Sequence, residues 1–271
     1  TCIDQTTLPF DPSKWADAMD TYPHALSNEA YFILNETTRT RPPQHASILY
    51  FMYAPLHSNS LSAVMVHVSG ADLPTCGWKE LPCATTHTAL AHRGSLTTIA
   101  LVEGTIAAET ETNTFNHVST EFTITSSSED PVQKNVRCIA TGTCIYQTSA
   151  KKLTINAVSF RLDSTVELLN CSLIAATAGA LVLQTVSISP DDSLADKGAQ
   201  HMNLSAPLIS ISQTVASTLD LTVEKVARQN GNGSVVSANL NKQSKFVLSA
   251  SSSFTGCSAQ FGGALYLSLS D

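Results

Sequence analysis

Charged residues are scarce in this chain. They make up 14% of its 271 residues, against about 25% in a typical soluble domain. Hydroxyl side chains take their place, with 33 Ser and 31 Thr. Thr is β-branched and packs well on a pleated surface, whereas a long amphipathic helix needs Glu, Lys and Arg on its wet side. The composition therefore predicts a β-rich protein.

Basic clusters and long apolar runs are also missing. The net charge is −7, and the 15 Lys and Arg are scattered singly except for the pair Lys151-Lys152. Nucleic-acid binding needs a basic patch or stripe, so we expect no nucleic-acid partner. No run of about 18 apolar residues occurs, so we expect no membrane segment within this chain and place any anchor outside it.

Catalytic signatures are missing as well. The chain has no G-x-S-x-G, no P-loop and no G-x-G-x-x-G. His87 and His92 lie five positions apart, not the four that places two ligands on one helical face, so we expect no metal and no cofactor. The pair Asp191-Asp192 follows Pro190 and is interpreted as a polar turn. The acids of the second half are interpreted as lying at different phases of the repeat described below; they are Asp163, Glu167, Asp191, Asp192, Asp196, Asp220 and Glu224.

Seven cysteines are present, and four of them form two closely spaced pairs. Cys76 and Cys83 flank one short loop, and Cys138 and Cys144 flank another. Such pairs are typical of disulfide-closed loops in an oxidising compartment. The alternative is a four-cysteine zinc site, which expects C-x2-C knuckles that are absent here. The sequence assigns no partner to the other three, which are Cys2, Cys171 and Cys257.

N-glycosylation acceptor sequences support an extracellular location weakly, because they also arise by chance in a Ser/Thr-rich chain. The four candidates are Asn35, Asn170, Asn203 and Asn232.

An internal repeat of about 28 residues is the most informative feature of the sequence. Five strand-like segments begin alike, at intervals of 27, 28, 27 and 29 residues. Earlier segments beginning at Val64, Leu96 and Phe122 extend the period with less regularity. The five segments are Leu153-Thr-Ile-Asn, Ala180-Leu-Val-Leu, Leu208-Ile-Ser-Ile, Val235-Val-Ser-Ala and Ala264-Leu-Tyr-Leu.

This period predicts a solenoid. One repeat cannot bury its own apolar side, so successive coils stack and pair equivalent strands in parallel around one core. A β-sandwich would instead show strands every 8–12 residues with tight hairpin turns, and Asn-Gly occurs only at Asn230-Gly231 and Asn232-Gly233. Glycines before strands, such as Gly179 and Gly262-Gly263, supply the positive φ that sharp corners require. We expect an excursion loop at residues 190–193.

The expected organisation is a coil with a cap. A short helix over Ala84 to His92 would cover the N-terminal end of the coil, since a solenoid needs a cap. Residues 1–62 show no repeat and are interpreted as an N-terminal cap or the tail of a preceding module. Residues 63–271 form the parallel β-helix, which we expect to continue beyond the C-terminus. Cys171 and Cys257 occupy equivalent points about three coils apart, and we expect both to be buried free thiols.

The repeat resembles that of pectin-lyase-like right-handed β-helix surface proteins. The segment Phe254-Thr-Gly-Cys-Ser-Ala followed by Gly262-Gly-Ala-Leu-Tyr is similar to polymorphic outer-membrane and adhesin-like repeats, although Cys257 stands where that motif has Asn. The strand at Val64, with the loop ending at Cys83, resembles the first coil of many such proteins, including protist ones. The resemblance implies an all-β, right-handed parallel β-helix at a cell surface or outside the cell, with a role in adhesion or envelope structure.

We therefore expect a non-catalytic surface module that is adhesin-like or structural. Its partners would be glycans or another cell-surface molecule. The alternative is a carbohydrate-active β-helix, a polysaccharide lyase or glycoside hydrolase, because the same fold hosts such enzymes. A smooth Ser/Thr/Asn face would favour the first hypothesis, and aligned carboxylates beside a basic residue would favour the second.

Overall fold

The computed structural model describes residues 62–67, 70, 72, 76–77, 82–93, 96–102, 105–109, 112–126, 134–138, 146–163, 172–191 and 201–270. The expected N-terminal unit, apart from Ser62, lies outside the described residues. So does most of the expected excursion loop. Its first residue, Pro190, ends a strand, and Asp191 follows it.

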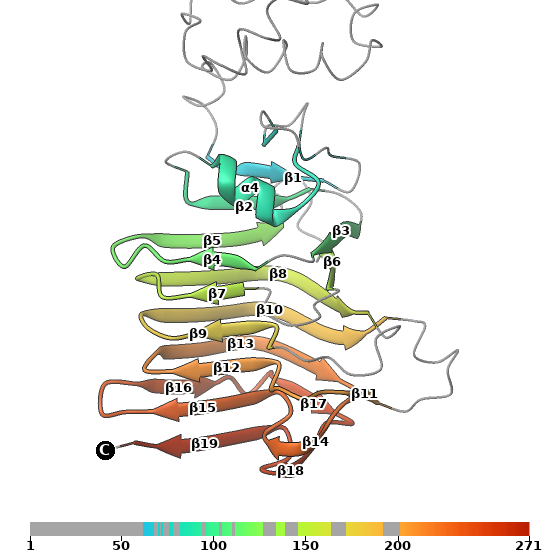
Figure 1. Cartoon of the computed structure of the whole chain (residues 1–271), viewed down its shortest axis with the longest axis vertical. Helices are drawn as coiled ribbons and strands as arrows, with labels where there is room; N and C mark the ends of the chain where they lie inside the picture. The colour runs from blue at the N-terminus through green and yellow to red at the C-terminus, as the bar shows by residue number, and fades with distance from the viewer. Residues whose placement is uncertain are drawn as a thin grey trace, which may run out of the picture.

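Long parallel sheets dominate the structure, which is all-β apart from one short helix. The largest sheet has ten strands, and every strand pairing reported among the described residues is parallel. In Figure 1 these strands lie one above another along the long axis. The strands of this sheet are β1 (Val64–Val66), β2 (Thr98–Leu101), β3 (Thr105–Glu109), β5 (Glu121–Ser126), β6 (Lys134–Cys138), β8 (Lys152–Leu162), β10 (Ala180–Pro190), β13 (Val215–Glu224), β16 (Lys245–Leu248) and β17 (Ser253–Thr255).

Two further parallel sheets complete the coils. A six-stranded sheet runs beside the first, and a three-stranded sheet lies near the C-terminal end (Figure 1). The six strands are β4 (Asn113–Phe115), β7 (Tyr146–Thr148), β9 (Ile174–Ala176), β12 (Ile209–Ser212), β15 (Val236–Leu240) and β19 (Leu265–Leu269). The three are β11 (Met202–Asn203), β14 (Val226–Asn232) and β18 (Ser258–Phe261).

The chain alternates between the sheets and returns to each after one coil. In the two large sheets, paired residues lie between 24 positions apart, as for Val136 and Phe160, and 35 apart, as for Ala180 and Val215. Because the connections are long and the pairing is parallel, β-hairpins have no part in this architecture. The arrangement is that of a parallel β-solenoid, as the repeat predicts.

Three long strands bend at the same position of the coil. Ala157, Thr185 and Asp220 have φ values of 55°, 50° and 59°. They are aligned, because the residues on either side of Thr185 pair with the residues on either side of Ala157 and Asp220. A left-handed residue turns the strand sharply, so each long strand contributes to two faces of the coil.

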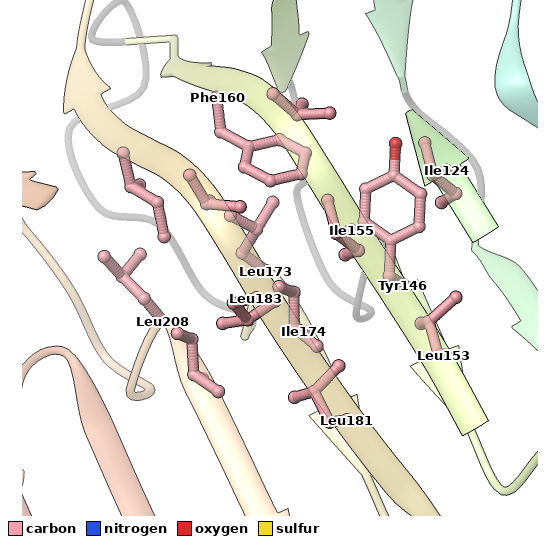
Figure 2. Close-up of a cluster of buried hydrophobic side chains, with 14 of the residues drawn as sticks. Ile124, Tyr146, Leu153, Ile155, Phe160, Leu173, Ile174, Leu181, Leu183 and Leu208 are labelled. Atoms are coloured by element: carbon pink, nitrogen blue, oxygen red, sulfur yellow. The ribbon is translucent and has the colours of Figure 1, made fainter. Parts of the chain in front are cut away.

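The core lies between the sheets. Leu153, Ile155 and Phe160 of β8 are fully buried, as is Tyr146 of β7. Figure 2 shows these side chains converging with Leu181 and other apolar residues from neighbouring coils. Tyr146 and Phe160 pack edge to face, with ring centroids 5.6 Å apart. One continuous apolar interior therefore stabilises successive coils.

The expected equivalence of the five repeat segments is wrong. The segments at Leu153 and Ala180 belong to the ten-stranded sheet, with Val64 and Phe122, whereas those at Leu208 and after belong to the six-stranded sheet. The cause is the coil that starts at Ala180, which is 35 residues long. Each coil carries two apolar strands, so a step of 28 residues inside this longer coil reaches the other sheet. The solenoid holds, but the assumed phase shifts by part of a coil.

The predicted N-terminal helix is confirmed. It is α4 (Thr86–His92), whose N-cap Thr85 accepts a hydrogen bond from the Thr88 amide. The helix packs against β1, β2 and β4. It therefore covers the first strands of both large sheets, as expected of a cap.

Candidate interaction surface

Polar side chains form regular rows on the outer face of the ten-stranded sheet. Thr154 lies between the buried Leu153 and Ile155 and so points away from the core. It pairs with Thr123 of β5, which pairs with Thr98 of β2. We call these three residues the threonine row. Since neighbouring strands lie about 4.8 Å apart, the row presents hydroxyls at that spacing over three coils.

A second row runs parallel to the first, two positions further along each strand. Thr125, Asn156 and Gln184 are in register in β5, β8 and β10. The Asn156 amide donates a hydrogen bond of 3.2 Å to the Thr125 hydroxyl. Thr125 and Asn156 are half-buried and Gln184 is exposed. The two rows together form a polar surface whose described members carry no charge.

The second half of the long strands carries hydroxyls and one guanidinium. The Ser187 hydroxyl donates to Ser159 in the preceding coil at 2.8 Å. Arg161 Nη1 donates to the Ser189 hydroxyl at 2.7 Å. Ser159 is nevertheless only 4% exposed, so this face offers less accessible polar surface than the threonine row does.

The prediction that the acids share no phase of the repeat is wrong for one pair. Asp163 directly follows Leu162 and Asp191 directly follows Pro190, and these two preceding residues are paired. The Asp191 amide also donates to the Leu162 carbonyl at 2.9 Å. The two aspartates therefore occupy equivalent places in adjacent coils, close to Arg161. Their separation of 28 residues, one coil of the sequence repeat, is the signal that would have found them.

The disulfide predicted between Cys76 and Cys83 is present. Both cysteines are buried, and their bonded sulfurs exclude the four-cysteine zinc site. The backbone of Cys138 lies in β6, but Cys144 lies outside the described residues, so that pairing stays a prediction. Cys2 and Cys171 also lie outside them.

Cys257 is a free thiol, as predicted, but it is half-buried rather than buried. It lies one residue before β18, near the C-terminal end of the coil, where fewer strands cover it. Its thiol contacts the Val223 carbonyl at 3.6 Å. Burial raises the pKa of this thiol above its ordinary value, which makes it a poor nucleophile at neutral pH.

Two of the four predicted glycosylation sites are described. Asn203 lies in β11 and Asn232 in β14, and both are half-buried. The backbone carbonyl of Asn232 accepts a 2.6 Å hydrogen bond from Arg228. Asn35 and Asn170 lie outside the described residues. Glycosylation at all four stays a prediction.

Ionic interactions contribute little to the described surface. Lys151 and Glu121 form an exposed ion pair at 2.7 Å, and the hydrogen bond from Lys151 lowers the pKa of the Glu121 carboxyl. Among the described residues there is no group of three or more His, Cys, Asp or Glu that could hold a metal. No described helix is long and apolar enough to cross a membrane.

Comparison with known proteins does not assign the chain. No protein-family model, no curated protein and no solved structure matches it. The functional argument therefore depends on the polar rows, the aligned aspartates and the fold itself.

Proposed function

We propose that this chain is a non-catalytic right-handed parallel β-helix module of the pectin-lyase-like kind, located at a cell surface or outside the cell. In this proposal its sheet faces bind glycans or another surface partner, as adhesin-like modules do. Parallel pairing at coil intervals supports the fold assignment, because a parallel strand–crossover–strand connection is right-handed in nearly all proteins. The Cys76–Cys83 disulfide supports an oxidising compartment.

The threonine row is the observation that carries the binding proposal. Thr98, Thr123 and Thr154 are each half-buried, held in register by the sheet. A rigid row of hydroxyls loses little side-chain entropy on binding, because β-branched Thr has few rotamers to give up. Each hydroxyl can both donate and accept, which matches the hydroxyl groups of a glycan. The second row of Thr125, Asn156 and Gln184 widens this surface.

A glycan array tests the proposal when the same glycans are also assayed for cleavage. We expect binding without release of reducing or unsaturated sugar. Thr123→Val together with Thr154→Val keeps the β-branched shape and removes two hydroxyls. Each lost hydrogen bond is worth about 1 kcal/mol, so affinity should fall by roughly tenfold or more.

Thr114→Val is the matched control for these variants. Thr114 is exposed on β4 of the six-stranded sheet, so its hydroxyl lies outside the proposed surface and binding should be unchanged. Equal losses for the control and the row variants would contradict the proposal. Absence of binding to any glycan would leave the structural role as the function of this module.

A carbohydrate-active enzyme is the second candidate, and the aligned aspartates favour it. Asp163 and Asp191 belong to adjacent coils, about 4.8 Å apart along the stack, and glycosidases use two carboxylates flanking one sugar bond. Arg161 lies two residues before Asp163. Against this candidate, Asp163 is only 4% exposed, which leaves little access for a polysaccharide. Sugar release that is abolished by Asp163→Asn and by Asp191→Asn would establish the enzyme and remove the first proposal.

A further inference from the structure

The first strand of the ten-stranded sheet is paired on both of its edges. On one edge β1 pairs with β2. On the other edge, the Met65 amide donates to the Gly77 carbonyl at 2.8 Å and the Cys83 amide donates to the Met65 carbonyl at 3.0 Å. The His67 amide donates to the Cys83 carbonyl at 2.9 Å. The hydrogen-bonding groups that β1 would offer to a further strand are therefore occupied.

Four residues make this closure, and we call them the edge cap: Cys76, Gly77, Pro82 and Cys83. The disulfide joins its two parts. Gly77 has φ +121°, and a Cβ there would approach Val64 Cγ1 to 2.7 Å. A Cβ on Gly70 would collide with the Cys83 carbonyl oxygen. The cap is thus fitted closely against β1.

The edge cap is also tied to the helix that follows it. The Asp72 carboxylate accepts hydrogen bonds from the backbone amides of Ala84 and Thr85 at 2.9 and 3.0 Å. The Thr85 hydroxyl donates to the same carboxylate at 2.9 Å. These bonds anchor the chain directly after Cys83 and hold the start of α4.

The opposite end of the same sheet has no comparable cover among the described residues. β16 pairs with β13 on one edge, and no pairing of its other edge is reported. Its core-facing Leu248 is 38% exposed, and Phe246 is only partly buried. Leu267 of β19, in the six-stranded sheet, is 51% exposed. An uncovered strand edge with apolar side chains is a template for pairing with another strand.

The two ends of the ten-stranded sheet are complementary. Each coil adds its strand to the preceding one in parallel, as β16 adds to β13. Val64 and Val66 of β1 face the core, as do Phe246 and Leu248 of β16. An uncapped β1 could therefore pair in parallel with β16 of another copy and continue both the sheet and the apolar interior. Such a contact is heterologous and generates open-ended assemblies.

We propose that the edge cap, held by the Cys76–Cys83 disulfide, prevents a second copy of this chain from adding its open edge to β1. Loss of the disulfide frees the cap from β1 and permits head-to-tail association. The inference does not depend on glycan binding, because it uses strand edges rather than the outer faces of the sheets.

The test removes the disulfide in the 271-residue chain with Cys76→Ser and Cys83→Ser. Hydrogen exchange of the Met65 and His67 amides should accelerate at least tenfold, since both donate to the edge cap. Sedimentation velocity should then show larger species whose proportion rises with protein concentration. Cys257→Ser is the control, because it removes a free thiol and keeps the disulfide; it should remain monomeric with protected amides.

A charge on the open edge separates specific pairing from aggregation. Leu248→Lys, added to the double serine variant, should restore the monomer while the Met65 and His67 amides still exchange fast. Val118→Lys adds the same charge at a residue that is 76% exposed and lies outside β16, so association should persist. A double variant that stays monomeric, or association that Leu248→Lys leaves intact, overturns the proposal.

A second variant covers the case in which the double serine variant loses its circular dichroism and does not fold. Gly77→Ala displaces the cap through Val64 while the disulfide remains. It should accelerate the same two amides at least tenfold and give the same concentration-dependent species. Protected amides or a monomer in a folded Gly77→Ala protein would equally refute the role of the cap.

Discussion

At the residue scale, corner positions differ in how strictly they require glycine. Gly179 has φ +73°, and a Cβ there would collide with the Ala150 carbonyl oxygen of the preceding coil. Gly263 has φ +54°, but a Cβ there would meet nothing within 4 Å. Ala in the left-handed region costs about 1–2 kcal/mol by itself, and only Gly179 adds a steric conflict between coils.

We therefore expect Gly179→Ala to lower the free energy of unfolding by roughly 3 kcal/mol or more. Gly263→Ala should lower it by only about 1–2 kcal/mol. Urea denaturation of both variants measures the difference. Equal losses would mean that the backbone conformation, and not the contact with the next coil, makes glycine necessary at Gly179.

The Glu121–Lys151 pair gives a second expectation at this scale, now for pH. The folded protein lowers the pKa of Glu121 below its ordinary value of 4.5, chiefly through the hydrogen bond from Lys151. The stabilisation is therefore present above the unfolded pKa and is lost as the pH falls through the lower folded pKa. An NMR titration should show this pKa rising toward 4.5 in Lys151→Ala. An unchanged pKa would assign the shift to another group.

At the scale of the strand, position in the stack decides what an apolar side chain contributes. Leu153 of β8 and Leu267 of β19 both face the interior, but Leu153 is fully buried and Leu267 is 51% exposed. Leu153→Ala should cost about 2–5 kcal/mol, as buried Leu→Ala changes do. Leu267→Ala should cost less than about 1 kcal/mol, since half of its surface already contacts solvent. Thermal and urea denaturation of the two variants test this, and similar costs would contradict the placement of β19 at an open edge.

Strand positions were predictable from the sequence, whereas their assignment to sheets was only partly so. Apolar alternation around Leu153 and Ala180 identified β8 and β10, because one buried face requires a period of two. The step from Ala180 to Leu208 crossed to the other sheet, because both sheets carry similar apolar strands. Only the observed pairing of Ala180 with Val215 reveals the longer coil.

Corners and surface features were harder to foresee, for different reasons. Gly179 was predictable, since glycine tolerates positive φ. The equivalent corner residues Ala157, Thr185 and Asp220 were not, because no side chain among them favours that conformation and only the stack imposes it. Asp163 and Asp191 fell at a coil spacing that becomes visible only when the register is known. The Cys76–Cys83 bond was predictable from spacing alone.

At the scale of the whole molecule, the solenoid is one-dimensional, so stability should vary along its axis. Each coil contacts only its neighbours, and the stability of such arrays is a sum of coil terms and interface terms. Interior strands such as β8 and β10 have neighbours on both edges. The edge cap and α4 cover the N-terminal end, whereas Leu248 and Leu269, which is 85% exposed, mark the opposite end.

We expect hydrogen exchange in the folded protein to reveal this gradient. Amides of β8 and β10 should exchange slowest, through openings that approach global unfolding, because both strands are paired on each edge and bury fully apolar faces. Amides of β16 and β19 should exchange at least a hundredfold faster, since the last coil can detach alone and loses one interface only. Mass spectrometry of peptides from these strands, at several denaturant concentrations, measures the opening free energies. Equal values in all four strands would mean that the coils unfold as one unit, and the terminal coil would then have to be as strongly held as the centre despite its exposed apolar edge.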